Sequence, residues 1–126
     1  MPLEDFNTEV PQDDGDIKKL KNYMQKDSPF LNPSLTIQNV SDAIEIPVRE
    51  LSLLINHKLN QHFYDFVNSY RINYAKNLLS DTTQKKRTIL EILYDSGFNS
   101  KSSFNTAFKK ETGTTPSLYR KNLIIK

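Results

Sequence analysis

The same spacing of apolar residues occurs twice in this 126-residue chain, once in each half. The first copy comprises Ile37, Val40, Ile46, Leu51, Leu54 and Ile55, and the second comprises Ile89, Ile92, Phe98, Phe104, Ala107 and Phe108. Apolar residues three and four apart share one helix face, so each copy predicts a short helix, a tight turn and a second helix. This is the helix-turn-helix pattern, whose second helix can enter the major groove of DNA.

The segment that joins the two copies predicts one long helix over about 63–80. Six apolar or aromatic residues are placed on one side of it: Phe63, Phe66, Val67, Tyr70, Tyr74 and Leu78. Eighteen helical residues span about 27 Å, and major-groove faces on one side of B-DNA repeat about every 34–36 Å. A rigid helix of this length could hold two reading helices in successive grooves.

Capping residues set the boundaries of the second copy. Thr88 and Glu91 have the spacing of a capping box, in which each side chain satisfies a backbone amide of the other residue. Gly97 and Gly113 suit left-handed helix ends, and Ser100 suits a helix start. We place the first helix-turn-helix at about 35–59 and the second at about 88–112. No pair of strands is evident, so the predicted fold class is all-α.

Acidic residues are concentrated at the amino end. Residues 1–16 hold six of the 15 acidic residues and none of the 17 basic ones, which leaves a net charge of +8 on the rest. We interpret 1–16 as a flexible acidic tail or inter-domain linker, followed by a short helix at about 16–26 within a domain spanning 17–126. A basic domain behind an acidic tail favours a polyanionic partner such as nucleic acid.

Several classes of protein are excluded by inventory. The chain has no cysteine and only three glycines, all far apart, so it has neither a disulfide framework nor a phosphate-binding glycine loop. No apolar run is long enough to cross a membrane, and the first residues lack a signal-peptide core. His57 and His62 are five residues apart, a spacing that does not put two metal ligands on one helix face. We therefore expect no enzymatic activity, metal or cofactor, and a cytoplasmic protein.

One long motif identifies a family. Residues 97–121, GFNSKSSFNTAFKKETGTTPSLYRK, resemble the signature of the AraC/XylS-type transcriptional regulators. The stretches LTIQNV (35–40) and FYDFVNSYRINYAKNLL (63–79) fit the first unit and the linker helix of that family, so the resemblance covers about residues 30–121.

The resemblance implies a domain of about seven helices, with two homeodomain-like helix-turn-helix units, that binds double-stranded DNA in a sequence-specific way. Such domains usually follow a sensing, dimerising or membrane-bound part of a longer chain, so we expect this segment to be a fragment that makes no membrane contact itself. RNA polymerase is a further candidate partner.

This chain departs from the family pattern at four positions. Glu45 stands where a glycine is common in the first turn, so that turn must use another geometry or accept strain. Ser41 stands where alanine is common. Leu53 and Thr106 stand where arginine is common, and leucine can touch a thymine methyl group but cannot form a hydrogen bond. We therefore expect few hydrogen bonds to bases.

Base contacts are expected from side chains that point away from the apolar stripes of the two reading helices. The base-contact candidates are Arg49, Glu50, Ser52, Leu53, Lys101, Ser102, Asn105 and Thr106. The phosphate candidates are Asn56, Lys58, Arg87, Ser100, Lys109, Lys110 and Arg120, with Lys85, Lys86 and Lys121 as weaker ones. Arginine can bind guanine O6 and N7 together, and asparagine can pair with an adenine edge. The alternative for Arg49 is a surface ion pair with Glu45 or Glu50.

A second function stays open at this point. The domain could be an all-helical protein-interaction module whose first reading helix has lost its role in DNA binding. Val48, Leu53 and Ile55 would then lie near the surface and dock a partner helix.

Overall fold

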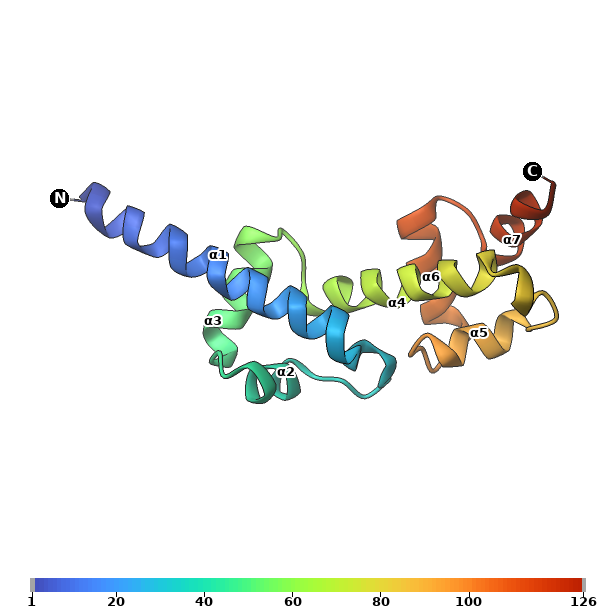
Figure 1. Ribbon diagram of the computed structural model, residues 1–126, viewed down its shortest axis with the longest axis horizontal. Coiled ribbons are helices and arrows are strands. Elements are labelled where there is room, and N and C mark those ends of the chain that lie inside the picture. Colours follow the sequence, from blue (N-terminus) through green and yellow to red (C-terminus); the bar gives the residue numbers. More distant parts are fainter. Residues whose placement is uncertain (1, 126) are drawn as a thin grey trace. The chain divides into compact units, whose positions relative to one another are not determined.

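A computed structural model describes the backbone of residues 2–125 and the side chains of residues 15–83 and 85–123. Within this range every regular element is helical and no strand occurs, which confirms the all-α prediction (Figure 1). The seven α-helices are α1 (Pro2–Asp27), α2 (Ile37–Ile44), α3 (Val48–Leu53), α4 (Phe63–Ser80), α5 (Ile89–Asp95), α6 (Lys101–Thr112) and α7 (Pro116–Ile125). Three shorter helical turns are η1 (Pro29–Leu31), η2 (Leu54–Lys58) and η3 (Thr82–Gln84).

The helices group into two compact units. The first unit comprises Met1–Pro29 and Leu35–Phe63, and the second comprises Phe30–Ser34 and Tyr64–Lys126. The first contains α2 and α3, and the second contains α5 and α6, so each predicted helix-turn-helix falls within one unit. The long helix α4 covers the predicted range 63–80 and lies almost wholly in the second unit.

Helix α1 is longer than the sequence predicted. It begins at Pro2, whereas we expected a flexible tail over 1–16 and a helix from about residue 16. The helical backbone continues through Pro11 and through the acidic residues on which the prediction of a flexible tail rested, because composition and propensity are only a weak guide to helix ends. Met1 and the side chains of 2–14 lie outside the described part. The assignment of 1–16 as an inter-domain linker stays a prediction.

Helix α2 is fixed at both ends. At its start, the Thr36 hydroxyl accepts from the Asn39 amide at 3.1 Å, and the Asn39 side chain accepts from the Thr36 amide at 2.9 Å. At its end, Glu45 adopts the left-handed conformation, with φ 59° and ψ 40°. The turn therefore accepts the strain that a glycine would avoid. The buried Ser41 hydroxyl donates to the Ile46 carbonyl across this turn, at 2.6 Å.

The second helix of the first helix-turn-helix is α-helical only in its first part. The predicted first helix-turn-helix runs to about residue 59, but the α-helical part of its second helix, α3, ends at Leu53 and continues as the π-turn η2. In this wider turn the Leu59 amide donates to the Leu54 carbonyl, five residues back, at 3.3 Å. Pro47 occupies the N-cap position of α3.

The second unit has one apolar core drawn from α4, α5, α6 and the turn between the last two. Its buried residues are Ile72, Ala75, Leu79, Ile92, Leu93, Phe98, Phe104, Ala107 and Phe108. The capping residues behave as predicted: Thr88 and Glu91 form both bonds of their box, and Ser100 accepts from the Ser103 amide at 3.2 Å. Gly97 and Gly113 have φ of +96° and +78°.

The buried face of α4 differs from the predicted one. Tyr70, Tyr74 and Leu78 are only half-buried, whereas Arg71 is 5% exposed. The interior face repeats every four residues through Val67, Arg71, Ala75 and Leu79. The prediction included Val67 but missed Arg71, Ala75 and Leu79, because a charged residue interrupts the apolar pattern.

Candidate nucleic-acid interface

Helix α3 presents a polar outer face over a buried apolar one. Leu51 is fully buried, as is Ile55 in the turn that follows, while Arg49, Glu50 and Leu53 are exposed. Leu53 is 47% exposed, so this apolar side chain lies on the outer face of the helix. Among the described side chains Arg49 forms no ion pair with Glu45 or Glu50, so its guanidinium is available to a base edge.

The rest of the first reading helix is less accessible. Ser52 is half-buried, and its hydroxyl accepts a long hydrogen bond from the exposed Asn56 side chain, at 3.4 Å. Lys58 lies in the last turn of η2 and is exposed. The protein-interaction alternative needed Val48 and Ile55 near the surface, but Val48 is half-buried and Ile55 is fully buried. Of that set, only Leu53 remains exposed.

Helix α6 presents its predicted candidates together. Phe104, Ala107 and Phe108 are buried. All six of the predicted base and phosphate candidates within it are exposed: Lys101, Ser102, Asn105, Thr106, Lys109 and Lys110. The first four lie in the first two turns of the helix, the part that reaches base edges in a helix-turn-helix. The exposure that base contact requires is thus present, and the contact itself stays a prediction.

Ser100 and most of the basic phosphate candidates already have partners within the chain. The Ser100 hydroxyl caps α6. Lys110 pairs with Asp65 of α4, with Nζ and Oδ1 3.1 Å apart. Arg87 pairs with Asp95, and Arg120 donates to the Arg87 carbonyl. A phosphate would have to compete with these contacts, whereas Lys101 and Lys109 have no such contact among the described residues.

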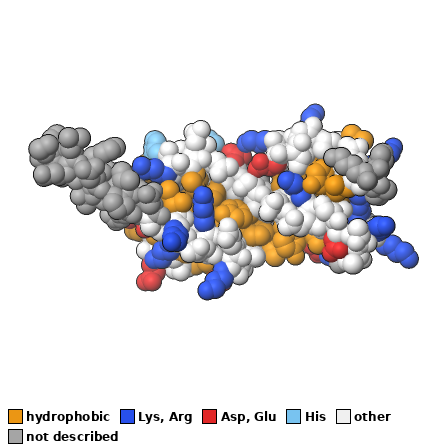
Figure 2. Space-filling view, turned by 45° about the horizontal axis from the view of Figure 1, so that its top comes forward, with side chains coloured by type: hydrophobic (Ala, Val, Ile, Leu, Met, Phe, Trp, Pro, Cys, Tyr) orange, Lys and Arg blue, Asp and Glu red, His pale blue; other side chains and the backbone are white. Residues whose placement is uncertain are grey.

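Basic side chains are distributed over the surface rather than confined to one helix. Figure 2 shows Lys and Arg in several separate places on the visible face, with apolar patches between them. Such a distribution suits contact with a phosphate backbone, in which many weak charge contacts add up to affinity.

Arg71 is the interior residue that sequence reasoning assigned no role. Its Nε donates to the Phe30 carbonyl at 2.7 Å, one terminal nitrogen donates to the Asn32 carbonyl at 2.9 Å, and the other donates to the Asn68 side chain at 3.1 Å. Its guanidinium carbon lies 5.7 Å from the centre of the Phe98 ring. Burial lowers the pKa of this guanidinium, and Tyr64 opposes the shift. The four-residue spacing from Val67 and Ala75 was the signal that could have placed it inside.

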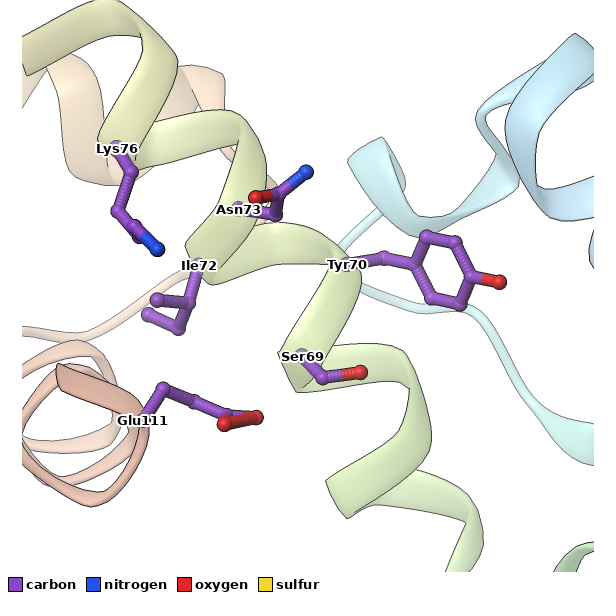
Figure 3. A pocket seen from close by; sticks show the side chains of 6 residues that line it. All are labelled: Ser69, Tyr70, Ile72, Asn73, Lys76 and Glu111. Carbon is purple, nitrogen blue, oxygen red and sulfur yellow. The ribbon is translucent and has the colours of Figure 1, made fainter. Parts of the chain in front are cut away.

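A shallow cleft of about 300 Å³ lies between α4 and α6. Figure 3 shows Ile72 between Lys76 and Glu111, which approach the cleft from the two helices, while Tyr70 points away. The Ser69 hydroxyl on its rim donates to the Phe66 carbonyl at 2.6 Å, so it is engaged with its own helix. Among the described side chains, no three His, Asp or Glu residues gather as metal ligands would. None of the described helices has both the length and the apolar character of a membrane span.

Comparison with known proteins places this geometry in a family. The sequence matches the family described as "Helix-turn-helix domain" over residues 40–122. It is 31% identical over 88 residues to the melibiose operon regulatory protein of Escherichia coli strain K12, covering 70% of this chain and 28% of that protein. The chain thus spans little more than a quarter of that relative's length.

Two solved structures have the same fold. The C-terminal domain of AraT, a response regulator from Geobacillus stearothermophilus, superposes with a TM-score of 0.69 at 29% identity, covering 84% of both chains. An AraC-type DNA-binding transcriptional regulator from Chromobacterium violaceum superposes with a TM-score of 0.68, covering 86% of this chain and 95% of that one. At 21% identity, the second likeness supports the fold alone.

Proposed function

The chain belongs to the AraC-type family of helix-turn-helix transcriptional regulators, whose domains bind DNA, and on that premise we propose that it is the operator-reading part of a longer regulator. The longer protein would add a sensing or dimerising domain, and RNA polymerase would be a partner of the assembled regulator. DNA binding would take place in the cytoplasm.

We propose that α3 and α6 each read a short motif in the major groove. The observation that carries this proposal is the pair of exposed polar faces, each on the second helix of its helix-turn-helix and each backed by buried apolar residues. Arg49 and Leu53 would contact bases from the first unit, and Lys101, Ser102 and Asn105 from the second. Contacts from lysine and arginine to phosphates would supply most of the affinity and a strong dependence on salt.

Selection from a random duplex pool, followed by anisotropy titrations in a salt series, tests the proposal. Enrichment of two short motifs about one helical turn apart supports two reading helices. Enrichment of a single motif would leave α3 without a reading role. Equal, weak binding of all duplexes would overturn sequence-specific recognition.

Charge reversal assigns the contacts. We expect Arg49→Glu and Lys101→Glu each to abolish selection of one motif, since each places a carboxylate against the DNA. Lys76→Glu on α4 is a matched control, because Lys76 lies outside both reading helices. Retention of both motifs by the two reading-helix variants would contradict the assignment.

A further inference from the structure

The short segment Phe30–Ser34, called the strap below, belongs to the second unit although the chain on both sides of it belongs to the first. The chain therefore passes between the units three times: before Phe30, after Ser34 and at the start of α4. Helix α4 is thus one of three covalent connections, and the strap accounts for the other two.

The strap is stiff. Its first two residues belong to the single helical turn Pro29–Leu31, and the Asn32 side chain then accepts a hydrogen bond from the Ser34 amide at 2.9 Å. Pro29 and Pro33 each fix a backbone dihedral, so the strap has little conformational freedom to lose.

Arg71 holds the strap on the second unit through hydrogen bonds. It bonds the carbonyl groups of Phe30 and Asn32, two residues apart, with the fixed fork of its guanidinium. The Phe30 ring stacks on Tyr70 with ring centres 5.7 Å apart, and Phe30 is 5% exposed. Tyr70 is the side chain that Figure 3 shows pointing away from the α4–α6 cleft.

The turn between α5 and α6 is built to receive the strap. A Cβ atom on Gly97 would lie 2.2 Å from the Phe30 carbonyl oxygen and 3.0 Å from Arg71 Nε. The strap backbone therefore packs directly on the helix-turn-helix turn of the second unit, at a place where no other residue fits.

Resting on the two-helix reading proposed above, we propose that Arg71 is a positioning residue for two-motif DNA binding. By holding the strap on the second unit, it limits how far the first unit can move away once one motif is bound. The second reading helix then meets its motif at a high effective concentration. Arg71 itself is buried and does not touch the DNA.

The test compares affinities for duplexes that carry one or both selected motifs. Arg71→Lys keeps the charge but loses the fork. A Gly-Gly insertion between Ser34 and Leu35 lengthens the connection from the strap to the first unit and keeps the hydrogen bonds from Arg71 to the strap. Asn68→Ala is the matched control, since it removes the hydrogen bond from Arg71 to Asn68 of α4 and keeps both bonds from Arg71 to the strap. In the absence of DNA, the rate of hydrogen exchange at the strap amides measures how firmly Arg71 holds the strap.

For both Arg71→Lys and the insertion, we expect the Kd for the two-motif duplex to rise at least about tenfold, with single-motif Kd values within about twofold. Arg71→Lys should also speed exchange in the strap, and Asn68→Ala should change neither quantity by as much. An unchanged ratio of two-motif to single-motif Kd in the insertion variant would overturn the inference while the proposed function stands. Equal loss for both kinds of duplex in both variants would show a purely structural role and would also overturn it. If the unaltered chain gains nothing from the second motif, the two-helix proposal fails, and the inference with it.

Discussion

The Ser41 hydroxyl donates a hydrogen bond to the Ile46 carbonyl at 2.6 Å, across the turn in which Glu45 is left-handed. The two departures from the family pattern in this turn, at Ser41 and Glu45, are therefore parts of one arrangement. Glu45 adopts the strained left-handed conformation, and the hydrogen bond from Ser41 of α2 holds the residue that follows it.

This arrangement predicts coupled effects on stability. Glu45→Gly should raise the free energy of unfolding by about 0.5–1 kcal/mol, the relief of left-handed strain less the extra entropy that glycine loses. Ser41→Ala should lower it by about 1 kcal/mol, the net value of one buried hydrogen bond. In a double-mutant cycle measured by urea unfolding, Ser41→Ala should cost less when residue 45 is glycine. Strict additivity would contradict the coupling.

The two left-handed glycines provide a matched pair. Gly113→Ala meets no atom within 4 Å of its new Cβ and should cost about 0.5–1 kcal/mol, the left-handed strain less the entropy that glycine loses on folding. Gly97→Ala has a similar φ but would place its Cβ against the Phe30 carbonyl, so it should cost clearly more. Thermal melts of both variants measure the two losses of stability. Equal losses would mean that the strap moves away from the new Cβ without a cost in stability.

Because Asp65 pairs with Lys110, we expect removal of the Asp65 carboxylate to raise the affinity for DNA. Both side chains are exposed enough for the pair to add little to stability. Asp65→Asn should free Lys110 for a phosphate and steepen the slope of log K against log salt by about one. Asp42→Asn on α2 makes the same change in net charge and serves as the control, since the recorded contact of Asp42 is with Gln38 rather than with a base. The proposal for Lys110 is wrong if the two variants have the same slope.

Leu53 predicts recognition of a thymine methyl group. Replacing one thymine of the first motif by deoxyuridine should raise Kd about fourfold, because roughly 0.8 kcal/mol accompanies burial of one such group. Leu53→Ala should bind the two duplexes equally. The same replacement in the second motif should affect both proteins alike. Identical sensitivity of the two proteins at every thymine of the first motif would exclude the contact.

The α5 capping box predicts a loss of stability in acid. Hydrogen bonds from Thr88, through its amide and its side chain, hold the pKa of Glu91 below its usual value. A carboxylate with a lowered pKa stabilises the fold above the unfolded-state pKa, about 4.3 for glutamate, and loses that contribution as pH falls through the folded-state value. Glu91→Gln keeps an acceptor and should flatten this part of the pH dependence of unfolding. Asp81, whose pKa Thr83 lowers in the same way, should give the remaining slope.

The sequence allowed prediction of those features that depend on local spacing. The bounds of α4, the capping box at Thr88 and the helix ends at Gly97 and Gly113 all follow from residue type and separation along the chain. The exposure of the reading-helix candidates followed as well, because an apolar stripe defines its opposite face.

Contacts between distant residues were beyond this reasoning. Arg71 meets the carbonyl groups of residues 41 and 39 positions away, and Lys110 meets an acid 45 positions away. All three separations are longer than any helix that the structure describes, so no spacing within one helix could have predicted these contacts. The π-turn after Leu53 was equally invisible, since its apolar residues fit an ordinary α-helix.

That π-turn has a consequence for comparing relatives. A hydrogen bond that reaches back five residues instead of four takes up one extra residue in the same turn. Up to Leu53, the reading helix can be matched position by position to a relative whose helix is regular throughout. Beyond it, an ungapped match puts Asn56, His57 and Lys58 one place out of phase, so their partners on the DNA must be assigned in space rather than by alignment.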